Sequence, residues 1–123
     1  MALPKQPVPD AELGVLRLLW EAESMTAREL AEAIYGQADN STIGTVQKLL
    51  QRLERKGCVK RDRRSFAHRF SAKVTQAAVA GRHLQWLAKK VSGGSLAPFI
   101  THLVQGKKLS EAEKEAIRRL LDE

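Results

Sequence analysis

Residues 40–73 read NSTIGTVQKLLQRLERKGCVKRDRRSFAHRFSAK, and the spacing of apolar residues changes within this stretch at Gly57. Before Gly57 the apolar residues recur every three or four positions, which is typical of an amphipathic helix. After it the period is two, over 58–63 and again over 68–72, with a basic turn between the two runs. The stretch therefore predicts a long helix that ends in a β-hairpin.

The two faces of this predicted helix differ in chemistry. One face is apolar and suits a protein core, with Ile43, Val46, Leu49, Leu50 and Leu53. The other face carries hydroxyl, amide and cationic side chains, which can bond base edges and phosphates. We expect this face to contact DNA through Ser41, Thr42, Thr45, Gln47, Lys48, Gln51 and Arg52. At the helix start, where Asn40 or Ser41 is the expected N-cap, free N–H groups and the helix dipole favour a phosphate.

The positive charge of the chain is concentrated in the same stretch. The 123 residues carry a net charge of +7, but residues 48–73 alone hold ten basic and two acidic side chains, a net charge of +8. A small basic surface of this kind predicts contact with nucleic acid, although a charged face by itself also fits a merely solvated surface. On the hairpin, we expect phosphate contacts from Arg63, Arg64, His68 and Arg69.

Two further helices are predicted before this stretch. Residues 11–22 have helical apolar spacing after Asp10, a good N-cap, and a capping box from Thr26 to Glu29 opens a short helix that stops at Gly36. The order helix, short helix, longer helix, basic hairpin is that of a winged helix-turn-helix, in which the third helix enters the major groove. We expect a DNA-binding domain over 10–73 after a loose tail over 1–9.

The remaining residues, 74–123, predict three more helices. They cover about 75–91, about 95–105 and a last helix opened by the capping box that begins at Ser110. A segment of about 50 residues with such short apolar helices is too small to bury its own core. We expect it to form a dimer through Val79, His83, Trp86, Leu87, Phe99, Leu103, Ile117 and Leu120. The predicted fold class is mainly α with a small β-hairpin wing.

Several short runs together resemble the penicillinase repressor family, the BlaI and MecI group. They are DAEL (10–13), LW (19–20), SMTAREL (24–30), TV (45–46), LLQRL (49–53), KG (56–57), VKR (59–61) and FAHRF (66–70). The resemblance extends from Pro9 to the C-terminus, including the Gly93-Gly94 break. It implies a homodimeric repressor that binds an inverted repeat containing TACA and TGTA in double-stranded DNA. It also implies that the three C-terminal helices interlock between two chains.

One departure from the family concerns the proteolytic inactivation of its members. Members controlled by a membrane-bound sensor metalloprotease are cut at an Asn-Phe bond in the dimerisation region. Counting from the double glycine, the matching pair in this chain is His102-Leu103, so the asparagine is absent. The resemblance makes this pair a candidate proteolytic site and the sensor metalloprotease a candidate partner.

Other classes of function find little support in the sequence. A single cysteine, Cys58, excludes an internal disulfide, and the chain has neither a signal peptide nor the roughly 18 apolar residues of a membrane span, so we expect a cytoplasmic protein. Its three histidines, His68, His83 and His102, have no cysteine partners for zinc. We expect no catalytic site, metal or cofactor. The alternatives are a winged-helix module that binds an acidic protein and an architectural binder without sequence preference.

Overall fold

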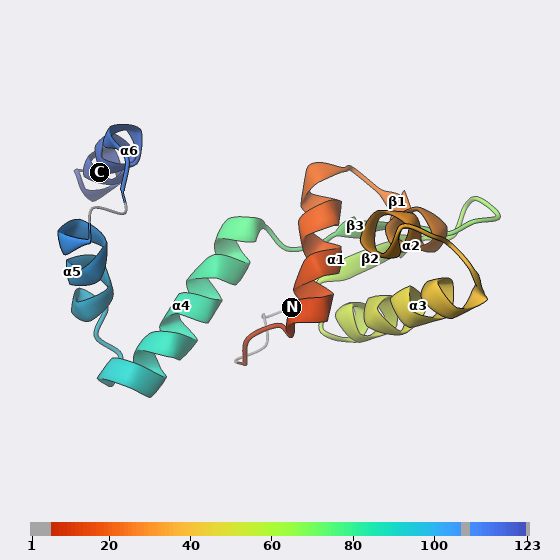
Figure 1. The fold of residues 1–123 in the computed structure, drawn as a ribbon, viewed down its shortest axis with the longest axis horizontal. Helices are drawn as coiled ribbons and strands as arrows, with labels where there is room; N and C mark the ends of the chain where they lie inside the picture. Colours follow the sequence, from red (N-terminus) through yellow and green to blue (C-terminus); the bar gives the residue numbers. More distant parts are fainter. Residues whose placement is uncertain (1–5, 107–108, 123) are drawn as a thin grey trace. The chain divides into compact units, whose positions relative to one another are not determined.

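The computed structural model describes residues 6–106 and 109–122 and is mainly helical, with one small sheet (Figure 1). The chain divides after Trp86 into two compact units. We call the described residues of the first unit, 6–86, the body, and those of the second the C-terminal helices. The elements are α1 (Asp10–Glu21), β1 (Met25–Thr26), α2 (Ala27–Tyr35), α3 (Asn40–Arg55), β2 (Val59–Asp62), β3 (Arg69–Ala72), α4 (Gln76–Ser92), α5 (Ala97–Gln105) and α6 (Glu111–Leu121).

The core of the body is formed by the apolar faces of α1, α2 and α3 together with the hairpin. All of the apolar residues predicted for the inner face of α3 except Ile43 are buried, and Ile43 packs against the same core. Cys58 contributes a fully buried side chain, and burial raises the pKa of its thiol, which disfavours the reactive thiolate. The buried residues from the other elements include Val15, Leu16, Leu19, Leu30, Ala31, Val59 and Phe70.

The sheet has one strand more than the hairpin predicted from the sequence. Its order is β1-β3-β2, with both pairings antiparallel, and Phe70 of β3 lies between Met25 and Arg61 in the register. The two residues of β1 are too few to show the alternation that marks a strand, so the sequence pattern indicated only a break there. This short strand attaches the hairpin to the connection between α1 and α2.

Two helix starts differ from those predicted. Asp10 lies inside α1 and is not its N-cap, since the carbonyl of Pro9 already accepts the amide of Leu13 at 2.9 Å. The N-cap of α3 is Asp39, one residue before the predicted Asn40 or Ser41. Its carboxylate accepts the amide of Thr42 at 2.8 Å, and the Thr42 hydroxyl accepts the amide of Asp39 at 3.0 Å. This reciprocal pair satisfies two backbone donors, which a cap at Ser41 would leave open.

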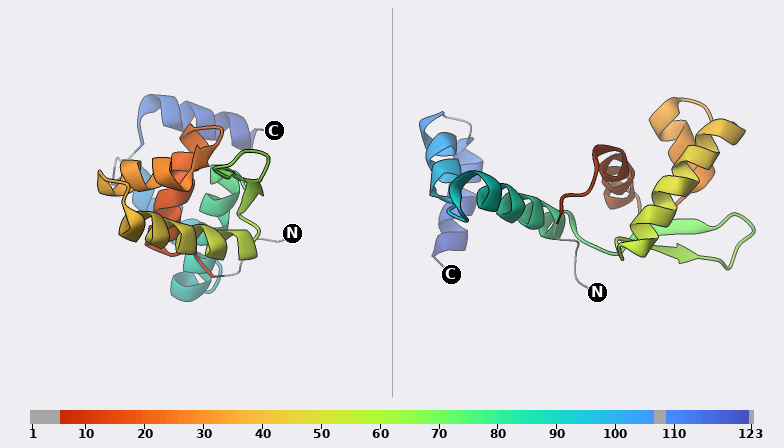
Figure 2. Two further views of the ribbon diagram at one scale, coloured as in Figure 1. Left: turned by 90° about the vertical axis from the view of Figure 1, so that its right-hand side faces the viewer. Right: turned by 90° about the horizontal axis from the view of Figure 1, so that it is seen from below.

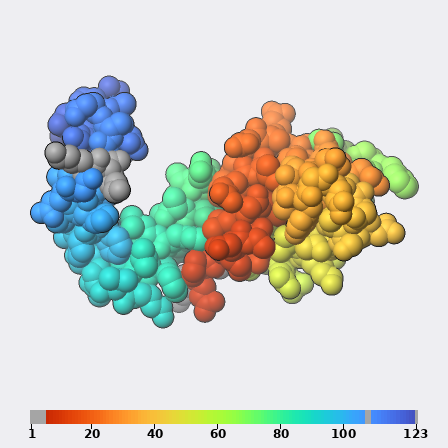
Figure 3. Space-filling model, in the orientation of Figure 1, coloured from red at the N-terminus to blue at the C-terminus, as the bar shows by residue number. Residues whose placement is uncertain are grey.

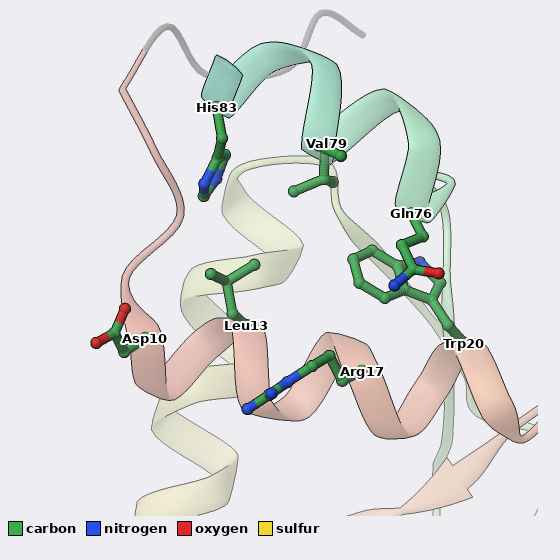
Figure 4. Close-up of a pocket in the computed structure, with 8 residues that line it drawn as sticks. Asp10, Leu13, Arg17, Trp20, Gln76, Val79 and His83 are labelled. Carbon is green, nitrogen blue, oxygen red and sulfur yellow. The ribbon is translucent and has the colours of Figure 1, made fainter. Parts of the chain in front are cut away.

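The first turns of α4 pack against α1 and belong to the body. Val79 and Leu13 face each other across a shallow groove of about 470 Å³, with Trp20 and His83 among the residues that line it (Figure 4). The Trp20 indole donates a hydrogen bond to the carbonyl of Val74 at 2.8 Å. His83 accepts the amide of Val8 at 2.9 Å. Val79, predicted for the dimer interface, is therefore already covered by its own chain.

The C-terminal helices are regular but bury little. The predicted capping box at the start of α6 is present, with Ser110 and Glu113 bonding each other's amides. Neither α5 nor α6 contains a buried residue among those described. Large apolar side chains are exposed along these helices at Leu87, Val91, Leu96, Ile100, Leu103, Val104, Ile117, Leu120 and Leu121. Within the described residues, no helix is both long enough and apolar enough to cross a membrane.

Candidate nucleic-acid interface

The face of α3 that points away from the core presents most of the side chains predicted to contact DNA. Ser41, Thr45, Gln47, Lys48, Gln51 and Arg52 are all exposed. Within the described part of the chain, the amides of Gln47 and Gln51 and the cations of Lys48 and Arg52 form no hydrogen bond or ion pair. These long side chains therefore remain available to an external partner with hydrogen-bonding edges or negative charge.

Two hydroxyl groups of this helix already bond within the chain, since that of Thr45 donates to the carbonyl of Ser41 at 3.0 Å and that of Thr42 is also engaged. Besides its part in the cap, the Thr42 hydroxyl lies 3.0 Å from the carbonyl of Gln37 and donates to it, so the group is fully used within the chain. The amide of Thr42 holds the pKa of Asp39 below its usual range, and the cap stays ionised near neutral pH. A carboxylate thus already occupies the N-terminus of α3, and it opposes a second anion at that point.

The wing between β2 and β3 carries exposed charge at its tip. The wing extends from the body at the right of the view in Figure 3. Arg63 and Arg64 are both exposed, but the Arg64 guanidinium lies 2.6 Å from the carboxylate of Asp62. This ion pair lowers the pKa of Asp62 to about 2. Phe66 is fully exposed beside these arginines, and sequence reasoning did not single it out as a contact residue.

The two predicted contact residues at the base of the wing are used by the body itself. Arg69 donates to the hydroxyl and the carbonyl of Ser24, at 2.8 and 2.9 Å, and lies 3.3 Å from the carboxylate of Glu29. His68 is half-buried, with its Nδ1 3.4 Å from Arg61. These contacts fix the hairpin against the α1–α2 connection, so their side chains position the wing.

A groove of about 480 Å³ lies between α3 and the wing. The helix contributes Gln47 and Gln51 to its lining, the wing contributes Phe66 and His68, and the start of α2 contributes Arg28. In Figure 2, right, α3 and the hairpin diverge from a common base. The structure thus brings the free amides of the helix and the side chains of the wing to one concave surface.

One ion pair inside the basic stretch was not visible in the sequence. Glu12 of α1 is only 2% exposed and lies 2.5 Å from the ammonium of Lys56, which follows α3. Helical spacing places Glu12 on the same face of α1 as the buried Val15, Leu16 and Leu19, but its partner lies 44 residues away and leaves no local signal. Lys56 therefore stabilises the body and is not a free cation of the surface.

The comparison with known proteins decides the family. The sequence matches the penicillinase repressor family over residues 8–123. The chain belongs to this family. Its curated relatives include the transcriptional regulator BlaI of Mycobacterium tuberculosis, 33% identical over 93% of this chain and 82% of the relative. Another is the methicillin resistance regulatory protein MecI of Mammaliicoccus sciuri, 24% identical over 94% of this chain and 93% of the relative.

Two solved structures are similar to this member of the penicillinase repressor family. MarR of E. coli has a TM-score of 0.47 with 23% identity, over 94% of this chain and 76% of the MarR chain. ZitR of Lactococcus lactis has a TM-score of 0.48 with 21% identity, over 99% of this chain and 76% of the ZitR chain. The element order of the body, three helices followed by a hairpin whose strands join β1 in one sheet, is itself that of a winged helix-turn-helix, and further helices follow it, as the sequence predicts.

The candidate proteolytic bond lies within α5. His102 and Leu103 are both exposed, and the carbonyl of His102 accepts the amide of Gly106 at 2.8 Å. Hydrogen-bonded helix must open before a protease can extend such a bond in its active site. Cleavage at this pair stays a prediction, as does the role of a sensor metalloprotease.

Proposed function

We propose that this protein is a dimeric transcriptional repressor that binds an inverted-repeat operator. In this proposal α3 enters the major groove, and the wing contacts the neighbouring backbone. The observation that supports it best is the exposed face of α3, where Gln47, Lys48, Gln51 and Arg52 have no partner in the described part of the chain. Amide and guanidinium groups in the major groove can each bond a base edge in two places, which is how sequence is read there.

The proposed dimer rests on the exposed apolar side chains of α5 and α6. Monomeric soluble proteins rarely leave contiguous apolar surface of this kind in water. A second copy of the chain would cover it and would place two α3 helices on one duplex, so that an inverted repeat matches the two-fold symmetry of the protein. The first turns of α4 in the predicted segment 74–123 belong to the body, so we propose residues 87–123 as the dimerisation segment, with Leu87, Phe99, Leu103, Ile117 and Leu120 at the interface.

A gel-shift titration separates this function from its alternatives. Wild-type protein is titrated onto a TACA/TGTA inverted repeat and onto a scrambled duplex, over a range of salt concentrations. We expect roughly a thousandfold preference for the repeat, and an affinity that falls with salt with a slope of about −0.9 per phosphate neutralised. Equal affinity for both duplexes indicates an architectural binder, and no binding to either indicates a module for an acidic protein.

The substitution Arg52→Ala tests the placement of α3. Arg52 is exposed and has no partner among the residues that the structure describes, so we expect its loss to leave the fold and the dimer intact while it removes a contact worth about 1–3 kcal/mol. We expect a loss of operator affinity of at least about tenfold in the same gel shift, with unchanged sedimentation. Arg17→Ala is the matched control, because Arg17 is an exposed arginine on α1. Unchanged binding by Arg52→Ala would contradict the placement of α3.

A further inference from the structure

Gly44 lies at the centre of the exposed face of α3. It is one helical turn from Ser41 and Lys48, and the buried residues Val46 and Leu50 lie on the opposite side of the helix. Residues three, four and seven positions apart share one face of a helix, so the side chains expected to contact DNA surround this glycine. The centre of the face that is expected to contact DNA is therefore occupied by a residue without a side chain.

The fold of the described chain gives no reason for a glycine at this position. A Cβ built on Gly44 meets no atom within 4 Å, and Gly44 is not among the glycines with positive φ. In the interior of a helix, glycine is the least favourable residue after proline. An alanine would fit the space and favour the helix, so the chain keeps a residue that weakens its own recognition helix.

We infer that Gly44 allows the backbone of α3 to approach the floor of the major groove. This inference rests on the proposed function. Ser41 and Thr45 flank the glycine, and their side chains are among the shortest that can bond a base edge. The Thr45 hydroxyl donates to the carbonyl of Ser41 at 3.0 Å, which leaves its oxygen to accept from a base. These side chains reach the bases only where the helix backbone comes close, and a Cβ at position 44 would hold the helix away. Gly44 is thus a positioning residue for sequence-specific binding.

The test is Gly44→Ala in the full chain, with Gly14→Ala as the matched control. Gly14 lies inside α1 on the side opposite the buried Leu16 and Leu19, outside the face expected to contact DNA, and a Cβ there also meets nothing within 4 Å. Both substitutions remove a helix glycine, so we expect each to raise the Tm by roughly 4 °C at equal protein concentration. Their effects on DNA binding should differ, because only Gly44 lies on the face of α3 that is expected to contact DNA.

The DNA probe is an inverted repeat that the wild-type protein selects from a random duplex pool, compared with its scrambled form. We expect Gly44→Ala to weaken binding to the selected duplex about tenfold and to leave binding to the scrambled duplex nearly unchanged. Gly14→Ala should bind both duplexes as the wild type does. The combination of a more stable protein with a weaker specific complex is the signature of close approach.

The outcomes distinguish this inference from the proposed function. If the wild type selects no preferred duplex, the proposed repressor function fails. If it does select one, and Gly44→Ala binds that duplex as tightly as Gly14→Ala, the close approach at Gly44 is wrong. Equal losses on selected and scrambled DNA also overturn the inference, because a contact with the groove floor discriminates between sequences and a phosphate contact does not.

Discussion

The body and the C-terminal helices use the same kinds of apolar side chains in opposite ways. In the body, α1, α2, α3 and the hairpin bury leucine and valine side chains in a common core. In α5 and α6 no described residue is buried, although both helices carry leucine, isoleucine or valine side chains. The difference indicates that the body carries its own core, whereas the C-terminal helices complete theirs only against another surface.

This difference also separates the two tasks of the proposed repressor. The surface of the body that faces outward on α3 is polar and cationic, so it suits a hydrated, charged duplex. The exposed side chains of α5 and α6 are apolar, so they suit a second protein chain. Substitutions confined to one region should therefore change one property and leave the other.

The largest expected effect is that of Leu120→Glu in α6. Leu120 is about two-thirds exposed, so the change leaves the single chain folded, but it places a charge in the proposed dimer interface. Loss of the dimer leaves one half-site contact, and we expect operator affinity to fall by about a thousandfold. Sedimentation equilibrium should show monomers, while urea unfolding followed at Trp20 should be unchanged for the body.

Arg119→Glu is the control for the introduced charge. Arg119 neighbours Leu120 and is exposed, and among the described residues its guanidinium pairs only with Glu115 of the same helix, at 3.8 Å. We expect this variant to remain dimeric. A Leu120→Glu protein that sediments as the wild-type dimer would show that α6 is not at the interface.

The second effect concerns the buried pair in the body. Lys56→Met leaves the Glu12 carboxylate, 2% exposed, without its cation. Breaking such a pair strands a charge away from water, and we expect a loss of about 3 kcal/mol in the free energy of unfolding. Urea denaturation measures it. The double variant Glu12→Leu with Lys56→Met should recover most of the stability, and Lys60→Met, at an exposed lysine, should change little.

In both regions, the sequence predicted the features that depend on neighbouring residues. The long helix and the hairpin were predicted because a change of apolar period at Gly57 is local. The capping boxes at Thr26 and Ser110 were predicted and confirmed for the same reason, since each spans four residues. The exposure of α5 and α6 also agrees with their apolar composition, because a short segment cannot bury that much surface alone.

The features that the sequence did not predict depend on contacts between distant residues. Strand β1 exists only through its pairing with β3, and the Glu12–Lys56 pair joins α1 to the residue that follows α3. The sequence predicted that Arg69, in a basic stretch, is free to contact phosphate, but its partners in the structure are Ser24 and Glu29. Charge counting along the chain finds where cations gather, and only the fold shows which of them are already paired.

The smallest expected effect is that of Asp62→Asn. It tests, on the wing, whether a cation that is paired within the fold is less available to DNA. Asp62 pairs with Arg64 at 2.6 Å, and this pairing lowers its pKa from 3.8 to about 2. A depressed carboxylate pKa means that the pair is present above about pH 4 and is lost only as the pH falls towards 2. At neutral pH the carboxylate therefore competes with DNA phosphates for Arg64.

Replacing Asp62 with asparagine removes one negative charge and releases Arg64. We expect affinity to rise roughly threefold on selected and scrambled duplexes alike, with a slightly steeper dependence on salt, because a phosphate contact carries no sequence information. The gain should be equal at pH 6 and pH 8, where Asp62 is fully ionised in the wild type. Gel shifts at two salt concentrations measure it, and a gain restricted to the selected duplex would place Arg64 at a base edge instead.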